Sequence, residues 1–157
     1  MSLLKAVGVK NAHVVRLLLG QGADVNFFEP SGSRNRTALE LAIEEKDTEI
    51  IRLLLEAGAD VNEPNRIMYR NTTLQDAVLA TNTEVVKLLL DAGADSYNAS
   101  IALQEAVRQN DTKMVMLLLD HGANINARAG TSGATAVQHA AMNGNFEILR
   151  ILLEDPS

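Results

Sequence analysis

Apolar residues recur at helical spacing in pairs of short segments along this chain. The segment 37–45 has apolar residues three and four positions apart, with charged residues between them: Leu39, Ala42 and Ile43. The segment 48–55 repeats that spacing with Ile50, Ile51, Leu54 and Leu55. Residues at this spacing share one face of an α-helix. The pattern therefore predicts two short helices, each with a wide apolar face, joined by a tight turn.

The ends of the second helix are also marked. Residues with short oxygen-bearing side chains stand just before it in three copies: Asp47, Asn82 and Asp111. Such side chains accept hydrogen bonds from the unpaired N–H groups at a helix start. Glycines follow its last leucines: Gly22, Gly58, Gly93 and Gly122. A left-handed glycine ends a helix without a steric cost, so both boundaries are predicted.

The helix pair recurs along the whole chain. The end of the second helix appears as LLLGQGADVN (17–26), LLLEAGADVN (53–62), LLLDAGADSYN (88–98), LLLDHGANIN (117–126) and a clipped ILLEDPS (151–157). The first helix appears as MSLLKA (1–6), TALELA (37–42), TTLQDA (72–77), IALQEA (101–106) and TAVQHA (135–140). The final alanines of this second motif are 36, 35, 29 and 34 residues apart. Such a period indicates stacked units, because one unit cannot bury its apolar face alone.

In this order, T-x-L-x-x-A and L-L-L-x-x-G-A-D-V-N resemble the ankyrin repeat. The resemblance covers essentially the whole chain and implies an all-α ankyrin-repeat solenoid of helix-turn-helix units with projecting β-turn finger loops. It divides a single domain, 1–157, into units 1–36, 37–71, 72–100, 101–134 and 135–157. The family's motif proline is replaced by Ala38, Thr73, Ala102 and Ala136. Its histidine is replaced by Glu40, Gln75, Gln104 and Gln138, whose side chains can still hydrogen-bond to a neighbouring loop.

By the same resemblance, the segments between units are the fingers. Segments 27–36 and 63–71 are long and begin with a proline-containing turn, whereas 127–134 is rich in small residues. Only SYNAS separates Asp95 from Ile101, which is too short for a projecting hairpin. We therefore expect a notch after the third unit. Both a shaped binding groove and neutral drift in loop length explain a missing finger.

Composition and charge exclude several classes of function. The chain has no cysteine, which excludes disulfides, thiolate metal sites and cysteine catalysis. Lys5 interrupts the apolar start and no run approaches the roughly 18 apolar residues of a membrane span, so we expect a soluble cytoplasmic or nuclear protein. Because 20 acidic against 14 basic residues give a net charge of −6, a nucleic-acid backbone would be repelled. This acidity also serves solubility alone.

The candidate binding residues follow from the ankyrin pattern, carried over position by position. On the groove side of the first helices they are Leu41, Glu44, Glu45, Asp76, Leu79, Glu105, Arg108, Gln109, His139, Met142 and Asn143. On the fingers they are Arg34, Arg36, Met68, Tyr69 and Arg70. Arg and Tyr beside exposed apolar groups are typical interface anchors. The expected acidic patch favours a protein partner with a basic segment.

Asp76, Glu105 and His139 share one position of the repeat and suggest a catalytic triad. Helices that pack about 8–10 Å apart place such residues beyond hydrogen-bonding reach, and no serine stands beside them, so we expect no enzyme activity. No histidine pair has metal-ligand spacing, so we expect neither a metal nor a cofactor. His121 lies at a helix C-terminus, where we interpret it as structural. Asn26, Asn62 and Asn126 resemble asparagines that are hydroxylated in some ankyrin proteins, although a loop hydrogen bond is the simpler role.

Terminal repeats normally carry a polar outer face. Here apolar residues remain at both ends: Leu3, Leu4 and Val7, then Phe146, Ile148 and Leu152. Two interpretations stay open. Either these end faces dock on another domain or a second copy of the chain, or the chain is an excerpt of a longer array. We favour the second.

The sequence as a whole predicts a protein-protein interaction module that binds its partner through the fingers and the concave groove. We expect this module to be part of a larger scaffold or regulatory protein. A structural spacer between other domains is the first alternative. A small-molecule receptor or enzyme that uses the groove is the second. An engineered binder is disfavoured by the unequal loops.

Overall fold

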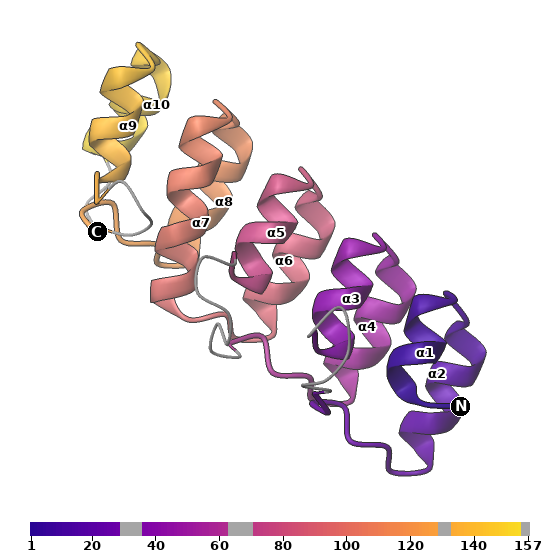
Figure 1. Ribbon diagram of the computed structural model, residues 1–157. Coiled ribbons are helices and arrows are strands. Elements are labelled where there is room, and N and C mark those ends of the chain that lie inside the picture. The colour runs from indigo at the N-terminus through magenta and orange to yellow at the C-terminus, as the bar shows by residue number, and fades with distance from the viewer. Residues whose placement is uncertain (29–35, 63–70, 129–132, 155–157) are drawn as a thin grey trace. The chain divides into compact units, whose positions relative to one another are not determined.

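A computed structural model describes residues 1–28, 36–62, 71–128 and 133–154. Within these ranges the chain is all-α, and its helices form antiparallel pairs (Figure 1). They divide between two compact units, Met1–Glu63 (unit 1) and Pro64–Ser157 (unit 2). Unit 1 contains α1 (Leu3–Gly8), α2 (Ala12–Gly20), α3 (Ala38–Glu44) and α4 (Thr48–Glu56). Unit 2 contains α5 (Thr73–Leu79), α6 (Thr83–Asp91), α7 (Ser96–Arg108), α8 (Thr112–Asp120), α9 (Ala136–Met142) and α10 (Phe146–Glu154).

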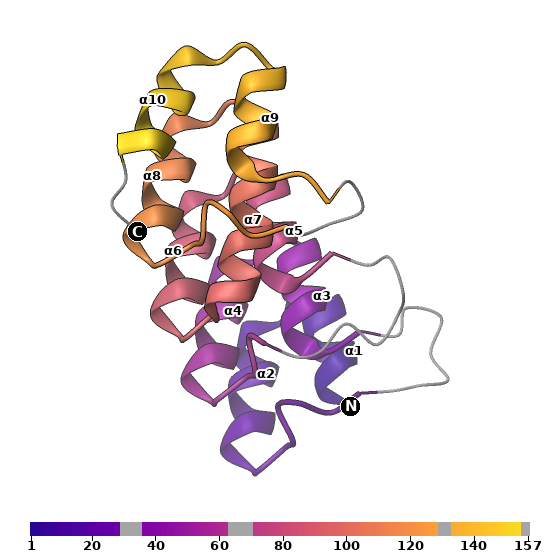
Figure 2. The ribbon, with the colours of Figure 1, turned by 90° about the vertical axis from the view of Figure 1, so that its left-hand side faces the viewer.

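In each unit the first helices of successive repeats pack side by side. In unit 1, α1 packs on α3, and α2 packs on α4. In unit 2, α7 lies between α5 and α9, and α8 packs on α10 (Figure 2). The predicted apolar faces fill the space between the helices. The largest side chains with less than 2% exposure are Val7, Leu39, Ile50, Ile51 and Leu54 in unit 1, and Leu74, Leu89, Leu103, Met114, Leu118, Ile148 and Leu152 in unit 2. Each contributes about 1.5–3 kcal/mol by leaving water.

The predicted helix boundaries are confirmed. The side chains of Asp47, Asn82 and Asp111 accept hydrogen bonds from the backbone N–H three residues later. The four glycines after the second helices all have positive φ, between 79° and 95°. The turn between the two helices of a repeat holds a feature that the sequence did not suggest. A residue other than glycine adopts a left-handed conformation there in four repeats: Lys10, Lys46, Thr81 and Asn110.

Asn26 ties neighbouring repeats together in unit 1. Its Oδ1 accepts a hydrogen bond from the Asp60 N–H (2.9 Å), and its Nδ2 donates to the Gly58 carbonyl (3.4 Å). The preferred loop-bonding role is therefore confirmed for this asparagine. Its own N–H donates to the Asp24 carboxylate, which shapes the turn.

The segment SYNAS is helical. It forms the first turns of α7, which spans 13 residues where the other first helices have six or seven. Two serines in this added segment form hydrogen bonds with backbone groups of the turn after α8. Asn26 forms the equivalent hydrogen bonds with the turn after α4. The Ser96 hydroxyl donates to the Gly122 carbonyl (3.0 Å), and the Ser100 hydroxyl accepts from the Asn124 N–H (2.9 Å). The missing finger is thus replaced by additional helix.

The expectation of apolar end faces at six positions is wrong for four of them. Leu3, Val7, Ile148 and Leu152 are buried inside their own units, because they lie on the faces that pack against the neighbouring helices. Leu4 is half-buried, and Phe146 is 82% exposed.

Candidate partner-binding face

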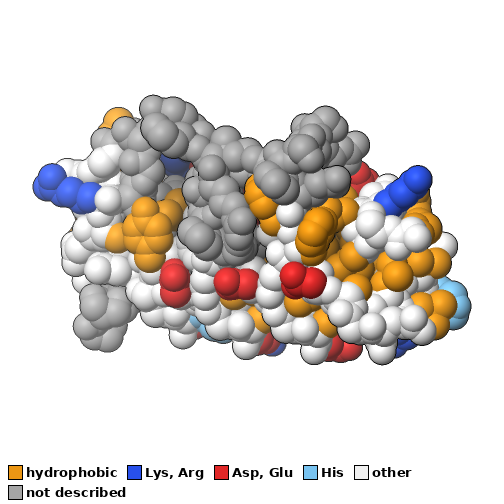
Figure 3. Space-filling view, turned by 60° about the horizontal axis from the view of Figure 1, so that its bottom comes forward, with side chains coloured by type: hydrophobic (Ala, Val, Ile, Leu, Met, Phe, Trp, Pro, Cys, Tyr) orange, Lys and Arg blue, Asp and Glu red, His pale blue; other side chains and the backbone are white. Residues whose placement is uncertain are grey.

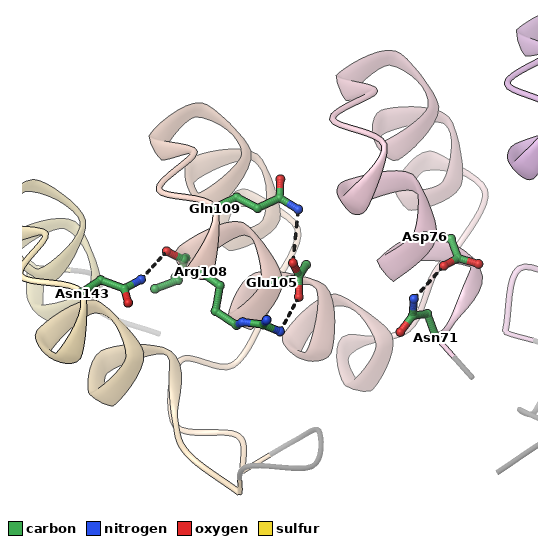
Figure 4. A network of polar contacts seen from close by, with 7 residues as sticks. Asn71, Asp76, Glu105, Arg108, Gln109 and Asn143 are labelled. Carbon is green, nitrogen blue, oxygen red and sulfur yellow. Dashed lines mark hydrogen bonds and ion pairs between the residues drawn. The ribbon is translucent and has the colours of Figure 1, made fainter. Parts of the chain in front are cut away.

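The first helices of unit 2 present one continuous row of the candidate residues. Asp76 and Leu79 lie on α5, Glu105 and Arg108 on α7, and Met142 on α9. Because α7 packs against both α5 and α9, these helices form a single surface, which we call the first-helix face of unit 2. Figure 4 shows polar side chains of this face on α5, on α7 and at the C-terminal end of α9.

Glu105 does not lie open on this face as expected. It is only 7% exposed, and its two carboxylate oxygens are held by side chains one turn further along α7. Arg108 Nη1 donates to Oε2 at 2.9 Å, and Gln109 Nε2 donates to Oε1 at 3.2 Å (Figure 4). A buried carboxylate needs such partners to offset its desolvation. The prediction that Glu105 contributes to an exposed acidic patch is therefore wrong.

Arg108 and Asn143 remain accessible. The Arg108 side chain is 60% exposed although it pairs with Glu105, and only its Nη1 has an assigned partner among the described residues. Asn143 ends α9 and donates from Nδ2 to the Val107 carbonyl of the preceding repeat at 3.2 Å. Both side chains are therefore fixed in position while part of their hydrogen-bonding capacity faces solvent.

The apolar residues predicted for the face in unit 2 are exposed. Leu79 at the end of α5 is 44% exposed, and Met142 at the end of α9 is 79% exposed. Asp76 is half-buried and accepts a hydrogen bond from Asn71 Nδ2 at 2.9 Å, whereas His139 is half-buried on α9. The face thus carries two apolar side chains at its edges and an internally neutralised Glu105–Arg108 pair at its centre.

In unit 1 the candidates are less available. Leu41 is 6% exposed, because α3 packs against α1 at this point, so its predicted exposure in the groove is wrong. Glu44 forms an ion pair with Arg36 at 3.0 Å. Glu45 pairs with Lys10 at 3.3 Å, and Lys10 Nζ also donates to the Glu45 carbonyl at 2.8 Å. Both acidic side chains therefore already have a cationic partner.

The finger candidates Arg34, Met68, Tyr69 and Arg70 lie outside the described residues. The face at the bottom of Figure 1 comes forward in Figure 3, where acidic side chains recur at intervals and hydrophobic side chains are exposed nearby.

The remaining chemical candidates have structural roles. His121 bonds the Leu117 carbonyl through Nδ1 at 2.8 Å, and its Nε2 lies 3.6 Å from Asp91, as expected for a residue that closes a helix. Gln104 Nε2 donates a hydrogen bond to the Ala127 carbonyl at 2.9 Å. The glutamine that replaces the motif histidine therefore still bonds to the neighbouring loop in this repeat. Among the described residues no three His, Asp or Glu side chains are grouped to hold a metal ion. No helix within those residues is long and apolar enough to cross a membrane.

Tyr97 is a candidate that sequence reasoning missed. It lies in the first turn of α7 and is 66% exposed. The sequence favours a shortened loop here, because no apolar periodicity marks SYNAS as helical. The available signal was Asp95, which caps α7 by accepting a hydrogen bond from the Asn98 N–H at 2.8 Å.

Comparison with known protein families gives one match. A family model for ankyrin repeats (three copies) matches residues 2–65 and 74–157. No curated protein matches the chain.

Proposed function

Because the chain belongs to the ankyrin-repeat family, whose repeats are generally protein-protein interaction modules, we propose that it binds a protein partner through the first-helix face of unit 2 and the adjoining finger loops. In this proposal it acts as the recognition part of a larger scaffold or regulatory protein. The family is typically non-enzymatic.

One observation carries the proposal. Leu79 and Met142 are large apolar side chains exposed on the same row of helices, with the accessible guanidinium of Arg108 between them. Arg is enriched among binding hot spots, and Met and Arg are both enriched at protein-protein interfaces. Because Leu79 is 44% and Met142 79% exposed, complete burial by a partner would contribute about 1 kcal/mol at Leu79 and about 2 kcal/mol at Met142.

Charge gives less support to a partner with a basic segment. That expectation relied on Glu44, Glu45, Asp76 and Glu105. Glu105 is buried against Arg108, and the two glutamates of unit 1 are paired with Arg36 and Lys10. We therefore propose that apolar contact, rather than attraction to a basic segment, is the main determinant of binding.

The test is quantitative capture from an extract of the source cells on three immobilised proteins. These are the wild type, the double variant Leu79→Ser/Met142→Ser, and the control Met116→Ser. Met116 is 51% exposed on α8, a second helix, so its replacement changes a similar side chain off the first-helix face.

We expect a protein that the wild type and the control retain and the double variant loses. Equal retention by all three would contradict the proposal and favour a structural spacer. Circular dichroism should show equal helicity for all three, because the replaced side chains are exposed.

A further inference from the structure

The long helix α7 carries an unusual stripe of residues. Tyr97, Ile101 and Arg108 are separated by four and seven positions, so at about 100° per residue they fall within roughly 40° of one another around the helix. Tyr97 is 66% exposed, Ile101 is half-buried, and the Arg108 side chain is 60% exposed. The added turns therefore extend the first-helix face of unit 2 and place an aromatic ring at its far end.

At the Arg108 end of this stripe, the member of the Glu105–Arg108 pair that faces solvent is the guanidinium. Glu105 is shielded by burial and by its two hydrogen bonds, whereas Arg108 faces solvent. The bond from Gln104 to the Ala127 carbonyl holds the next loop against α7, and the exposed Arg128 follows directly. At the other end of the helix the exposed Asp95 stands two residues before Tyr97, and its carboxylate accepts a hydrogen bond as the N-cap, so that end offers an apolar ring rather than a cation.

Glu105 has the character of a positioning residue. A carboxylate this buried is costly to keep, and a leucine of similar volume would avoid that cost. What Glu105 provides is a fixed orientation for Arg108 Nη1 and for the Gln109 amide. A guanidinium held on one side and open on the other is prepared to bind a carboxylate through its remaining N–H groups.

We infer that the α7 stripe binds an extended partner segment with two anchors, a carboxylate side chain on Arg108 and an apolar or aromatic side chain on Tyr97. This inference rests on the proposed function and specifies the kind of partner. The eleven-residue separation of the two anchor sites along α7 corresponds to about 16 Å. An extended chain advances about 3.3 Å per residue, so the two partner side chains should be about five residues apart. Tyr97 binds at low entropic cost, because it has few rotamers and stands on a helix.

The test uses a displayed library of random 12-residue peptides selected on the wild-type chain. The best peptide is then synthesised, and its affinity is measured by fluorescence anisotropy for the wild type, Arg108→Ala, Tyr97→Ala, Tyr97→Phe, Glu105→Gln and the control Met116→Ser. A second peptide has its acidic residue replaced by the matching amide.

We expect selected peptides to share an acidic residue about five positions from an apolar one. Arg108→Ala and Tyr97→Ala should each weaken binding about tenfold or more, whereas Tyr97→Phe and Met116→Ser should not. Glu105→Gln should weaken binding to the acidic peptide more than to its amide version, which a purely structural role would not produce. The amide peptide should lose affinity for the wild type but not for Arg108→Ala.

Three outcomes would overturn the inference. One is the selection of peptides that share basic residues, or of peptides whose affinity does not change in Arg108→Ala and Tyr97→Ala. If such peptides no longer bind Leu79→Ser/Met142→Ser, the proposed function still stands. Another is no enrichment at all, after which the extract capture alone decides the proposed function. The third is self-association of the chain that Tyr97→Ala abolishes, which would assign the stripe to a second copy.

Discussion

Thr81 should be replaceable by glycine with a gain in stability. It occupies the turn between α5 and α6 with φ 53°, the left-handed region. A β-branched residue is the least suited to this conformation, because its branched Cβ crowds the following carbonyl oxygen. Its hydroxyl makes one exposed hydrogen bond, to the Ala80 carbonyl, so little else is lost on replacement.

The magnitude follows from two opposing terms. A left-handed residue other than glycine costs about 1–2 kcal/mol in the folded state. Glycine gives the unfolded chain more conformational freedom, which costs about 0.4–1 kcal/mol. Thr81→Gly should therefore raise the free energy of unfolding by roughly 0.5–1 kcal/mol. For a chain of this size that corresponds to an increase in Tm of about 2–4 °C per kcal/mol.

The assay is urea unfolding followed by circular dichroism, with Thr83→Gly as the matched control. Thr83 is also exposed, but it is the first residue of helix α6 and is not among the residues with positive φ. Its replacement should lower the free energy of unfolding by a few tenths of a kcal/mol, because glycine favours the helix slightly less than threonine does. Loss of stability in Thr81→Gly, or equal effects of the two changes, would refute the assignment of strain to this turn.

Three further changes test other parts of the account. Gly58→Ala should destabilise the protein by about 1–2 kcal/mol, because Gly58 has φ 84°. Gly8→Ala should stabilise it by a few tenths of a kcal/mol, because alanine favours the helix and the added methyl group would lie 3.8 Å from Leu41. Thermal unfolding measures both, and changes in stability of the same sign would contradict the reasoning. Asn26→Ala should cost about 1 kcal/mol because two hydrogen bonds to the next repeat are lost; an unchanged midpoint in urea would show that they contribute nothing. Glu105→Leu should leave stability within about 1 kcal/mol, because the Arg108 side chain that loses its partner is 60% exposed and can turn to water, so no buried charge is left unpaired. Binding of the selected acidic peptide should weaken. Urea unfolding and fluorescence anisotropy measure the two effects, and a large loss of stability would make Glu105 a structural residue.

The repeat itself was readable from the sequence. Helix positions, the caps Asp47, Asn82 and Asp111, and the glycine ends depend on short-range patterns, and all are confirmed except the start of α7. The family is likewise confirmed. That residues 1–157 form a single domain of five repeat units stays a prediction.

The site was less readable, because exposure depends on what packs against each residue. Leu41, Leu79 and Met142 were all predicted to be exposed on the first helices, yet Leu41 is buried and the other two are exposed. Glu105 was interpreted as one charge in a column of the repeat, whereas its environment is set by Arg108 and Gln109 on the same helix. The helical start of α7 was missed because a loop and an added turn have the same length in the sequence.

The central claim is that the partner is held on the first helices of unit 2. Hydrogen-deuterium exchange, measured on the chain alone and with its captured partner, tests this most directly. We predict slower exchange at the ends of α5, α7 and α9, around Leu79, Arg108 and Met142, with α6, α8 and α10 unchanged. Protection confined to the second helices, around Met116, would contradict the account.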